Sequence, residues 1–189
     1  ARRRVLYVGP EGDAPGEPDR HFLALLAALP ARDCAAYLLR GGGEAPTGIF
    51  TESFGGHRPT KRHLMKRYAA VTRLRECDAI GLVVAGGLHV RRDARAGLRR
   101  TLRSLRRLAT EGLGARGTYT FLLGGNVDAN KLGNYPECDG FVLLTCPGHG
   151  ADALAPGGGS GEFHVPVLSA WEAAVACGVR RWEDGDCYA

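Results

Sequence analysis

Several signatures of metal binding and catalysis are missing from this chain of 189 residues. Its six cysteines, at positions 34, 77, 138, 146, 177 and 187, form no Cys-x-x-Cys pair and no zinc-finger spacing. Any metal site must therefore draw its ligands from distant parts of the chain. The sequence also contains no His-x-x-x-His pair, no Ser/His/Asp set, and no complete Walker or dinucleotide-binding loop. Motifs of this local kind therefore identify no reaction class.

Long hydrophobic runs are also missing. No apolar stretch approaches the roughly eighteen residues that a membrane-spanning helix needs, so we expect a soluble, cytoplasmic protein without a membrane partner. The chain has no signal-peptide pattern, but it also lacks an initiator methionine and enters a strand almost at once. We therefore expect it to be a piece of a longer chain, with any targeting signal upstream.

Lysine is scarce, because 22 of the 25 basic residues are arginines and the formal net charge is +5. Four of these arginines, Arg99, Arg103, Arg106 and Arg107, fall opposite an apolar stripe in the helix expected from Leu98 to Ala109. That basic face either docks an acidic partner or RNA, or is the solvated outer face of a helix packed on a sheet. Charge runs usually mean the second, which we favour, and nucleic-acid binding is not the preferred interpretation.

Five short apolar runs end in glycine or proline and predict β-strands. Their apolar residues are continuous rather than alternating, which is typical of strands covered on both faces in a parallel sheet. The predicted strands are Arg4–Val8, Ala35–Leu39, Ala79–Val84, Thr118–Leu123 and Gly140–Leu144.

Helical periodicity lies between these runs, so we expect an α/β fold with mainly parallel sheets flanked by helices. Helices are predicted from His21 to Leu29 and from His63 to Arg75, the second with Leu64, Tyr68, Val71 and Leu74 on its apolar side. A last helix begins with a capping box formed by Ser169 and Glu172 and stops at Gly178.

The aperiodic segment Gly41–Thr60 predicts a division of the chain into two units. Residues 1–60 are then expected to hold a short β-α-β lobe and an irregular linker, and residues 61–189 a fuller unit with three strands. The glycine-rich segment Ala155–Gly161 is expected to be a surface loop. The six histidines are scattered, and we expect each to be a surface residue rather than a ligand.

One cysteine, Cys146, occupies a position that suits a functional thiol. Cys146 follows the predicted strand Gly140–Leu144 almost directly, and Pro147 prevents the strand from continuing. Ligands of open parallel sheets bind at the carboxyl ends of the strands, so this thiol would be presented on the ligand side. The alternative is a small buried hydrophobic residue, which is a common fate of a free cysteine.

The block from Gly124 to Pro147 resembles a known family, the diphthamide synthesis proteins. Shared features are Lys131-Leu132, Asn134-Tyr135-Pro136-Glu137, Asp139, Phe141-Val142-Leu143 and Cys146-Pro147. Weaker likenesses occur at Leu64–Tyr68, Ala79–Val84 and Pro166–Glu172, so the resemblance covers nearly the whole chain. The Asn-Tyr-Pro-Glu form is closest to the second, supporting subunit of the eukaryotic heterodimer.

This resemblance implies three similar α/β units, of which the chain would hold the later part of the second and the third. It also implies a role in the first step of diphthamide synthesis, in which a 3-amino-3-carboxypropyl group moves from S-adenosylmethionine to a histidine of translation elongation factor 2. The implied cofactors are a [4Fe–4S] cluster, with Cys146 as one ligand, and S-adenosylmethionine, bound mainly by the catalytic subunit. The implied partners are that homologous subunit, elongation factor 2 and an electron-donor protein.

Two departures from the family pattern bear on the role of the chain. Gly148 follows Cys146-Pro147 where catalytic relatives carry arginine, so no catalytic residue is assigned to this chain. Ser169-Ala170 replaces Thr-Pro, a change that the capping box tolerates. Two alternatives stay open: a structural partner without a cluster, and a basic domain associated with RNA.

Overall fold

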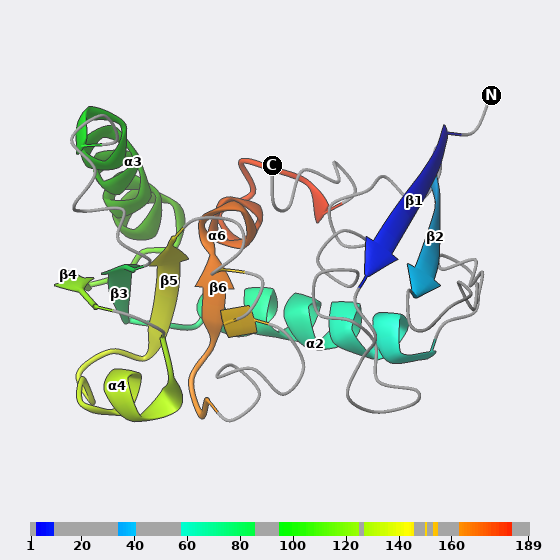
Figure 1. Ribbon diagram of the computed structural model, residues 1–189. Helices are drawn as coiled ribbons and strands as arrows, with labels where there is room; N and C mark the ends of the chain where they lie inside the picture. Colours follow the sequence, from blue (N-terminus) through cyan, green and yellow to red (C-terminus); the bar gives the residue numbers. More distant parts are fainter. Residues whose placement is uncertain are drawn as a thin grey trace.

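The computed structural model describes the sheets and most of the helices that the sequence predicts (Figure 1). The structure describes residues 3–9, 34–40, 58–85, 95–124, 127–145, 150, 153–154 and 163–182. The helix predicted at His21–Leu29 and the loop predicted at Ala155–Gly161 lie outside these ranges. None of the described helices has both the length and the apolar character needed to cross a membrane.

Four parallel strands form the main sheet in the order β4-β3-β5-β6. The strands are β3 (Ala79–Val84), β4 (Gly117–Leu122), β5 (Gly140–Leu144) and β6 (Val167–Ser169). All three pairings are parallel, with Gly81 of β3 opposite Phe141 of β5. The prediction of a mainly parallel sheet from continuous apolar runs is therefore confirmed.

Apolar side chains cover the central strands β3 and β5 on both faces, which explains the lack of alternation in these two strands. One core contains Ile80, Leu82 and Val84 of β3, and the other contains Val83 from the same strand. All five residues of β5 are buried. Successive side chains of a strand point to opposite faces. When both faces are buried, a polar side chain at any position would lose its contact with water, so every position favours an apolar residue.

Three helices cover the first face (Figure 1). They are α2 (Arg58–Leu74), α3 (Arg95–Arg107), which continues into the π-helical turn η1 (Leu108–Gly112), and α6 (Ala170–Ala176). Leu105 of α3 is buried, whereas the four predicted outer arginines are exposed. The placement of the basic face of α3 toward solvent is therefore confirmed.

The second face is covered by the short helix α4 (Ala129–Gly133) and by residues 153–154 and 163–165. Leu132 of α4 is buried, and the ring of Tyr135 lies 4.0 Å from that of Phe121, measured between centroids. Asp128 caps the helix by accepting a hydrogen bond from the Lys131 N–H at 2.9 Å. Many residues that carry the family resemblance thus build this layer.

A separate two-stranded parallel sheet is formed by β1 (Arg3–Gly9) and β2 (Cys34–Arg40). Both strands agree with the sequence prediction to within a residue at each end. In Figure 1 helix α2 runs from the four-stranded sheet toward this smaller sheet.

Two features of the region differ from the sequence prediction. Helix α2 begins at Arg58, inside the segment expected to be irregular, because Pro59 suits the first turn of a helix. Strand β6 was missed: it contains only three residues, too few for a period to show. The capping box at Ser169 and Glu172 is confirmed, as is the left-handed stop at Gly178, where φ is 73°.

A close contact at Gly81 predicts that the sheet tolerates no side chain there. A Cβ atom added to Gly81 would lie 2.5 Å from Cδ1 of Phe141, whose buried ring crosses the glycine. We expect Gly81→Ala to lower the free energy of unfolding by about 1–3 kcal/mol through overpacking. Urea denaturation measures this loss.

Gly97 in helix α3 provides the control, because no atom lies within 4 Å of an added Cβ. We expect Gly97→Ala to raise the free energy of unfolding by about 0.5–1 kcal/mol. A Gly81→Ala variant as stable as the parent would contradict the packing of Phe141 described here.

Candidate functional site

The carboxyl ends of the strands form one edge of the main sheet, where the sequence places Cys146. The Ala85 N–H donates to the carbonyl of Leu144 at 3.0 Å, and the Leu123 N–H donates to that of Val84 at 2.9 Å. Strands β3, β4 and β5 therefore end side by side. Since β5 lies between β3 and β6, the chain leaves the interior of the sheet at Thr145.

Cys146 itself lies outside the described residues, together with Pro147 and Gly148, so its side chain is not placed. Thr145, the residue before it, is described. Its buried Oγ1 has no hydrogen-bond partner among the residues that the structure describes. A buried hydroxyl without a partner is costly, and such a group is satisfied when a bound ligand or cofactor accepts its hydrogen bond.

A glycine lies against the same threonine. An added Cβ at Gly150 would lie 3.3 Å from Cγ2 of Thr145, tighter than an ordinary contact. The chain therefore passes close to Thr145 again after the Cys146 segment.

Two other cysteines are buried at the opposite, amino-terminal edge. Cys77 precedes β3 by two residues, and Cys138 precedes β5 by two residues. The Cys77 thiol donates to the carbonyls of Arg73, at 3.4 Å, and Asp139, at 3.3 Å. Burial raises the pKa of each of these two thiols to about 11. Both are protonated at neutral pH, whereas a metal ligand must be a thiolate.

The remaining cysteines do not add ligands in the described part. Burial also raises the pKa of Cys177, whose thiol donates to the Leu108 carbonyl at 3.5 Å. Cys34 is the first residue of β2, and Cys187 lies outside the described ranges. Within those ranges, no group of three or more His, Cys, Asp and Glu side chains could hold a metal ion.

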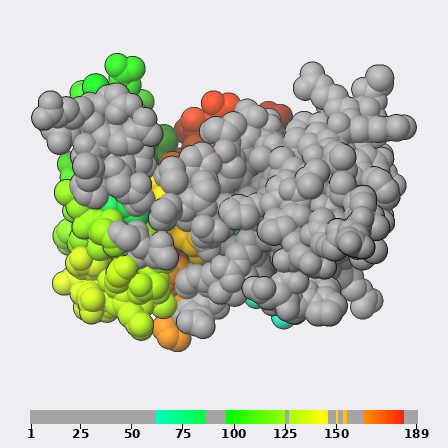
Figure 2. Space-filling model, viewed as in Figure 1, coloured from blue at the N-terminus to red at the C-terminus, as the bar shows by residue number. Residues whose placement is uncertain are grey.

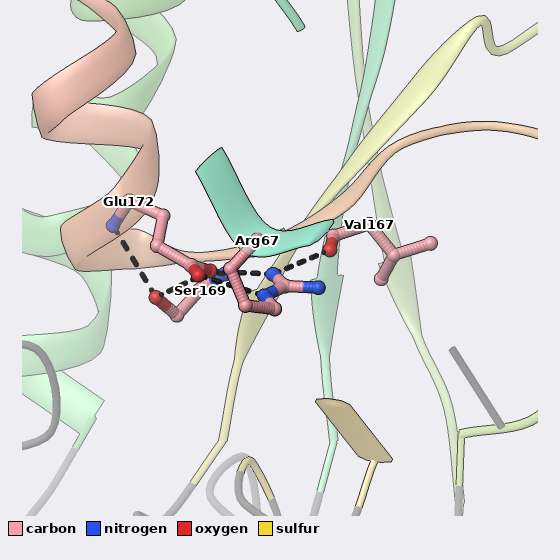
Figure 3. Close-up of polar contacts among 4 residues, drawn as sticks. All are labelled: Arg67, Val167, Ser169 and Glu172. Atoms are coloured by element: carbon pink, nitrogen blue, oxygen red, sulfur yellow. Dashed lines mark hydrogen bonds and ion pairs between the residues drawn. The ribbon is translucent and has the colours of Figure 1, made fainter. Parts of the chain in front are cut away.

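A buried ion pair stands beside the end of β6 (Figure 3). The Arg67 guanidinium of α2 donates from Nε to Glu172 Oε1 at 2.8 Å and from one terminal nitrogen to Oε2 at 2.6 Å. The same nitrogen donates to the carbonyl of Val167 at 2.8 Å. Ser169 completes the group, because its N–H donates to Glu172 Oε2 at 2.8 Å.

The buried side of α2 differs from the apolar side that the sequence predicts. His63, Arg67, Val71 and Leu74 are buried, whereas Tyr68 is 50% exposed. The prediction that each histidine is a surface residue is therefore wrong for His63. Burial, and next to it the neighbouring Arg67 charge, together lower the pKa of His63 to about 4, so its imidazole is neutral at pH 7. The pattern of apolar residues does not reveal this side, because Arg67 can be buried only when it is paired with Glu172, 105 residues away in the sequence.

Asp139, another residue of the family resemblance, has a structural role. Its Oδ2 accepts hydrogen bonds from the N–H groups of Asp78, at 3.2 Å, and Ala79, at 3.1 Å. It therefore ties the start of β5 to the start of β3. Correct placement of β5 in turn fixes where the chain exits toward Cys146.

A model of the diphthamide synthesis protein family matches residues 51–188. That match covers well over half of the sequence, so the chain belongs to the diphthamide synthesis protein family. The resemblance seen in the block from Gly124 to Pro147 is confirmed.

The relatives in this family include proteins named 2-(3-amino-3-carboxypropyl)histidine synthase subunit 2. The Rattus norvegicus protein is 42% identical over 112 residues, which are 59% of this chain and 20% of that protein. The Homo sapiens protein is 40% identical over 122 residues, which are 65% of this chain and 22% of that protein. The chain thus spans about a fifth of the length of these curated relatives.

A solved structure confirms the fold. The crystal structure of Dph2 from Pyrococcus horikoshii with a 4Fe-4S cluster superimposes with a TM-score of 0.57 and 17% sequence identity. The alignment covers 95% of this chain and 42% of that chain. At this identity the likeness establishes a shared α/β fold, and the cluster is a property of the Pyrococcus protein.

The Arg67–Glu172 ion pair predicts a large loss of stability when one partner is removed. We expect Glu172→Gln to lower the free energy of unfolding by about 3–5 kcal/mol, because Arg67 would remain buried beside a neutral amide. Chemical denaturation measures the loss. The control is Glu111→Gln, which removes a pair with Arg107 whose side chains are 72% and 74% exposed and should cost less than about 0.5 kcal/mol. Equal effects of the two changes would contradict the account.

The raised thiol pKa values predict slow alkylation. In the folded protein at pH 8, we expect iodoacetamide to leave Cys77 and Cys138 unmodified, because both thiols are buried and protonated. In urea both should react fully, and peptide mass spectrometry distinguishes the two conditions. Rapid labelling of Cys138 in the folded state would show that it is available as a ligand.

Proposed function

We propose that this chain is part of subunit 2 of 2-(3-amino-3-carboxypropyl)histidine synthase. This enzyme carries out the first step of diphthamide synthesis, the transfer of an aminocarboxypropyl group from S-adenosylmethionine to a histidine of translation elongation factor 2. The observation that carries the proposal is the 42% identity to proteins of that name. The parallel sheet, with Cys146 next to the end of β5, supports it.

Cys146 is the residue that we assign to the cofactor. Its thiolate would be one ligand of a [4Fe–4S] cluster whose other ligands lie in parts of the full protein that this chain does not contain. Two features support the assignment: Cys146 directly follows Thr145 in the sequence, and the Thr145 hydroxyl has no hydrogen-bond partner in the described part of the chain. When bound, such a cluster supplies single electrons.

The chain's own residues hold the cluster ligand and provide no acid or base to the transfer. Asp139 sets the start of β5, and the two cores bury all of that strand, so Thr145 emerges at a fixed point. Gly148 stands where catalytic relatives carry arginine, which favours a supporting or electron-relay role for this subunit. S-adenosylmethionine would then be bound mainly by the catalytic subunit.

The partners in this proposal are the homologous catalytic subunit, elongation factor 2 as the substrate and an electron-donor protein, all in the cytoplasm. Residues 1–60 would be the later part of a second α/β unit with a linker, and residues 61–189 the third unit. The separation of the β1–β2 sheet from the four-stranded sheet is consistent with this division.

Iron content tests the assignment of Cys146. We expect Cys146→Ala, in the full-length protein reconstituted without oxygen, to lose most of its iron and its brown absorbance, because a thiolate ligand is removed. Iron and protein are measured together on purified material.

Cys177→Ala is the matched control and should keep its iron, since that thiol donates to a backbone carbonyl instead. Unchanged iron in the Cys146→Ala variant would exclude the ligand role. A parent protein that takes up no iron at all would favour the alternative of a structural subunit without a cluster.

A further inference from the structure

Strand β4 forms one edge of the four-stranded sheet, with hydrogen bonds to β3 on one side in the described part of the chain. The N–H groups of Gly117 and Leu123 donate to carbonyls at the two ends of β3, Asp78 and Val84, at 3.1 and 2.9 Å. Because the direction of N–H groups alternates along a strand, those of Thr118, Thr120 and Leu122 point away from β3. A free edge of this kind is a template for another strand.

Two large apolar side chains are exposed along this edge. Tyr119 is 47% exposed and Leu122 is 62% exposed. Tyr119 is held in place by stacking against Phe121, with 6.4 Å between ring centroids. Solvent-exposed edges are usually protected by charges within the strand, whereas β4, with the sequence Gly-Thr-Tyr-Thr-Phe-Leu, contains none.

A row of arginines on α3 lies beside the same edge. Arg99, Arg103 and Arg106 are spaced by four and three residues, so they share one flank of the helix. Arg106 donates to Thr120 Oγ1 of β4 at 2.9 Å, which places this flank next to the edge strand. Helix α3 and strand β4 lie at the outer side of the molecule (Figure 2, green).

The charge of this flank is largely uncompensated. Helix α3 contains no acidic residue. In the described part of the region, the ion pairs involve other arginines: Arg107 with Glu111 at 3.6 Å and Arg116 with Asp78 at 3.5 Å, both exposed. The flank therefore favours negatively charged groups.

We propose that this β4–α3 surface, made by Tyr119, Leu122, Arg99, Arg103 and Arg106, docks an extended acidic segment of a partner protein. The segment pairs with β4 through main-chain hydrogen bonds. Its side chains alternate, so that acidic groups meet the arginine flank and apolar groups lie over Tyr119. The surface lies along β4, the outer strand on the side of the sheet opposite β6. The proposal does not depend on a cluster at Cys146.

The free strand edge distinguishes a protein segment from RNA. RNA would use the arginines and Tyr119, but it cannot continue a β-sheet ladder through the outward N–H groups. A peptide satisfies the arginines, the apolar side chains and the backbone together. Binding should therefore depend on both charge and strand pairing.

The test uses a fluorescent synthetic peptide that alternates glutamate and valine, with the full-length protein and anisotropy as the readout. We expect binding that weakens with added salt, as for exposed charges. The double change Arg99→Glu and Arg103→Glu should raise Kd by about tenfold or more. Arg62→Glu on the exposed side of α2 makes the same kind of charge reversal elsewhere and should leave Kd nearly unchanged.

Strand pairing is tested at Thr118. Thr118→Pro removes an outward N–H that makes no bond to β3 and should raise Kd, whereas Thr118→Ala keeps the N–H and should not. Thermal unfolding confirms that each variant is folded. A peptide of the same composition with its glutamates grouped should bind more weakly.

Three results would overturn the proposal. One is the absence of binding by the alternating peptide. Another is a Kd unaffected by Thr118→Pro in a folded protein, which would show that no strand pairs with β4. The third is tighter binding of single-stranded oligouridylate than of the peptide, lost in the arginine double variant, which would assign the surface to RNA.

Discussion

The buried pair of Arg67 and Glu172 is the interaction on which the arrangement of the main unit depends. It joins helix α2 to the start of α6 across more than a hundred residues and, through the Val167 carbonyl, to strand β6. A guanidinium buried in this way is stable only with its bidentate carboxylate and with hydrogen bonds that satisfy both groups. The ion pair therefore ties these three elements to one another. With β6 fixed, β5 is held between two strands, and its exit toward Cys146 is fixed as well.

The position of the candidate ligand follows from the sheet rather than from a local motif. Parallel strands bring loops that are distant in sequence to one edge, so a cluster ligand needs no neighbouring cysteine in the chain. Among the described thiols, Cys77 and Cys138 are buried at the amino-terminal ends of the strands, and burial raises the pKa of each to about 11. This division explains how six cysteines can occur without any metal-binding spacing.

Much of the fold could be predicted from sequence, because the central strands β3 and β5 are apolar on both faces and the predicted strands are followed by glycine or proline. The bounds of Ala79–Val84 and Gly140–Leu144 were predicted without error. Strand β6 was missed because three residues are too few to show a period, and the buried side of α2 was missed because Arg67 and His63 look like surface residues until Glu172 is placed. Cys146 was predicted as a site from its strand-end position and from the family resemblance, and its role remains a prediction. The unpartnered hydroxyl of Thr145 could not be predicted, since a threonine in sequence does not reveal whether its oxygen has a partner.

We propose that the full-length protein supports the aminocarboxypropyl transfer without performing it. Mass spectrometry of elongation factor 2 tests this claim directly, after incubation with S-adenosylmethionine, a reductant and either the full-length protein alone or the protein with its catalytic partner. The account predicts a mass gain of one aminocarboxypropyl group only when both subunits are present. A gain with this subunit alone would contradict it and identify a self-sufficient enzyme.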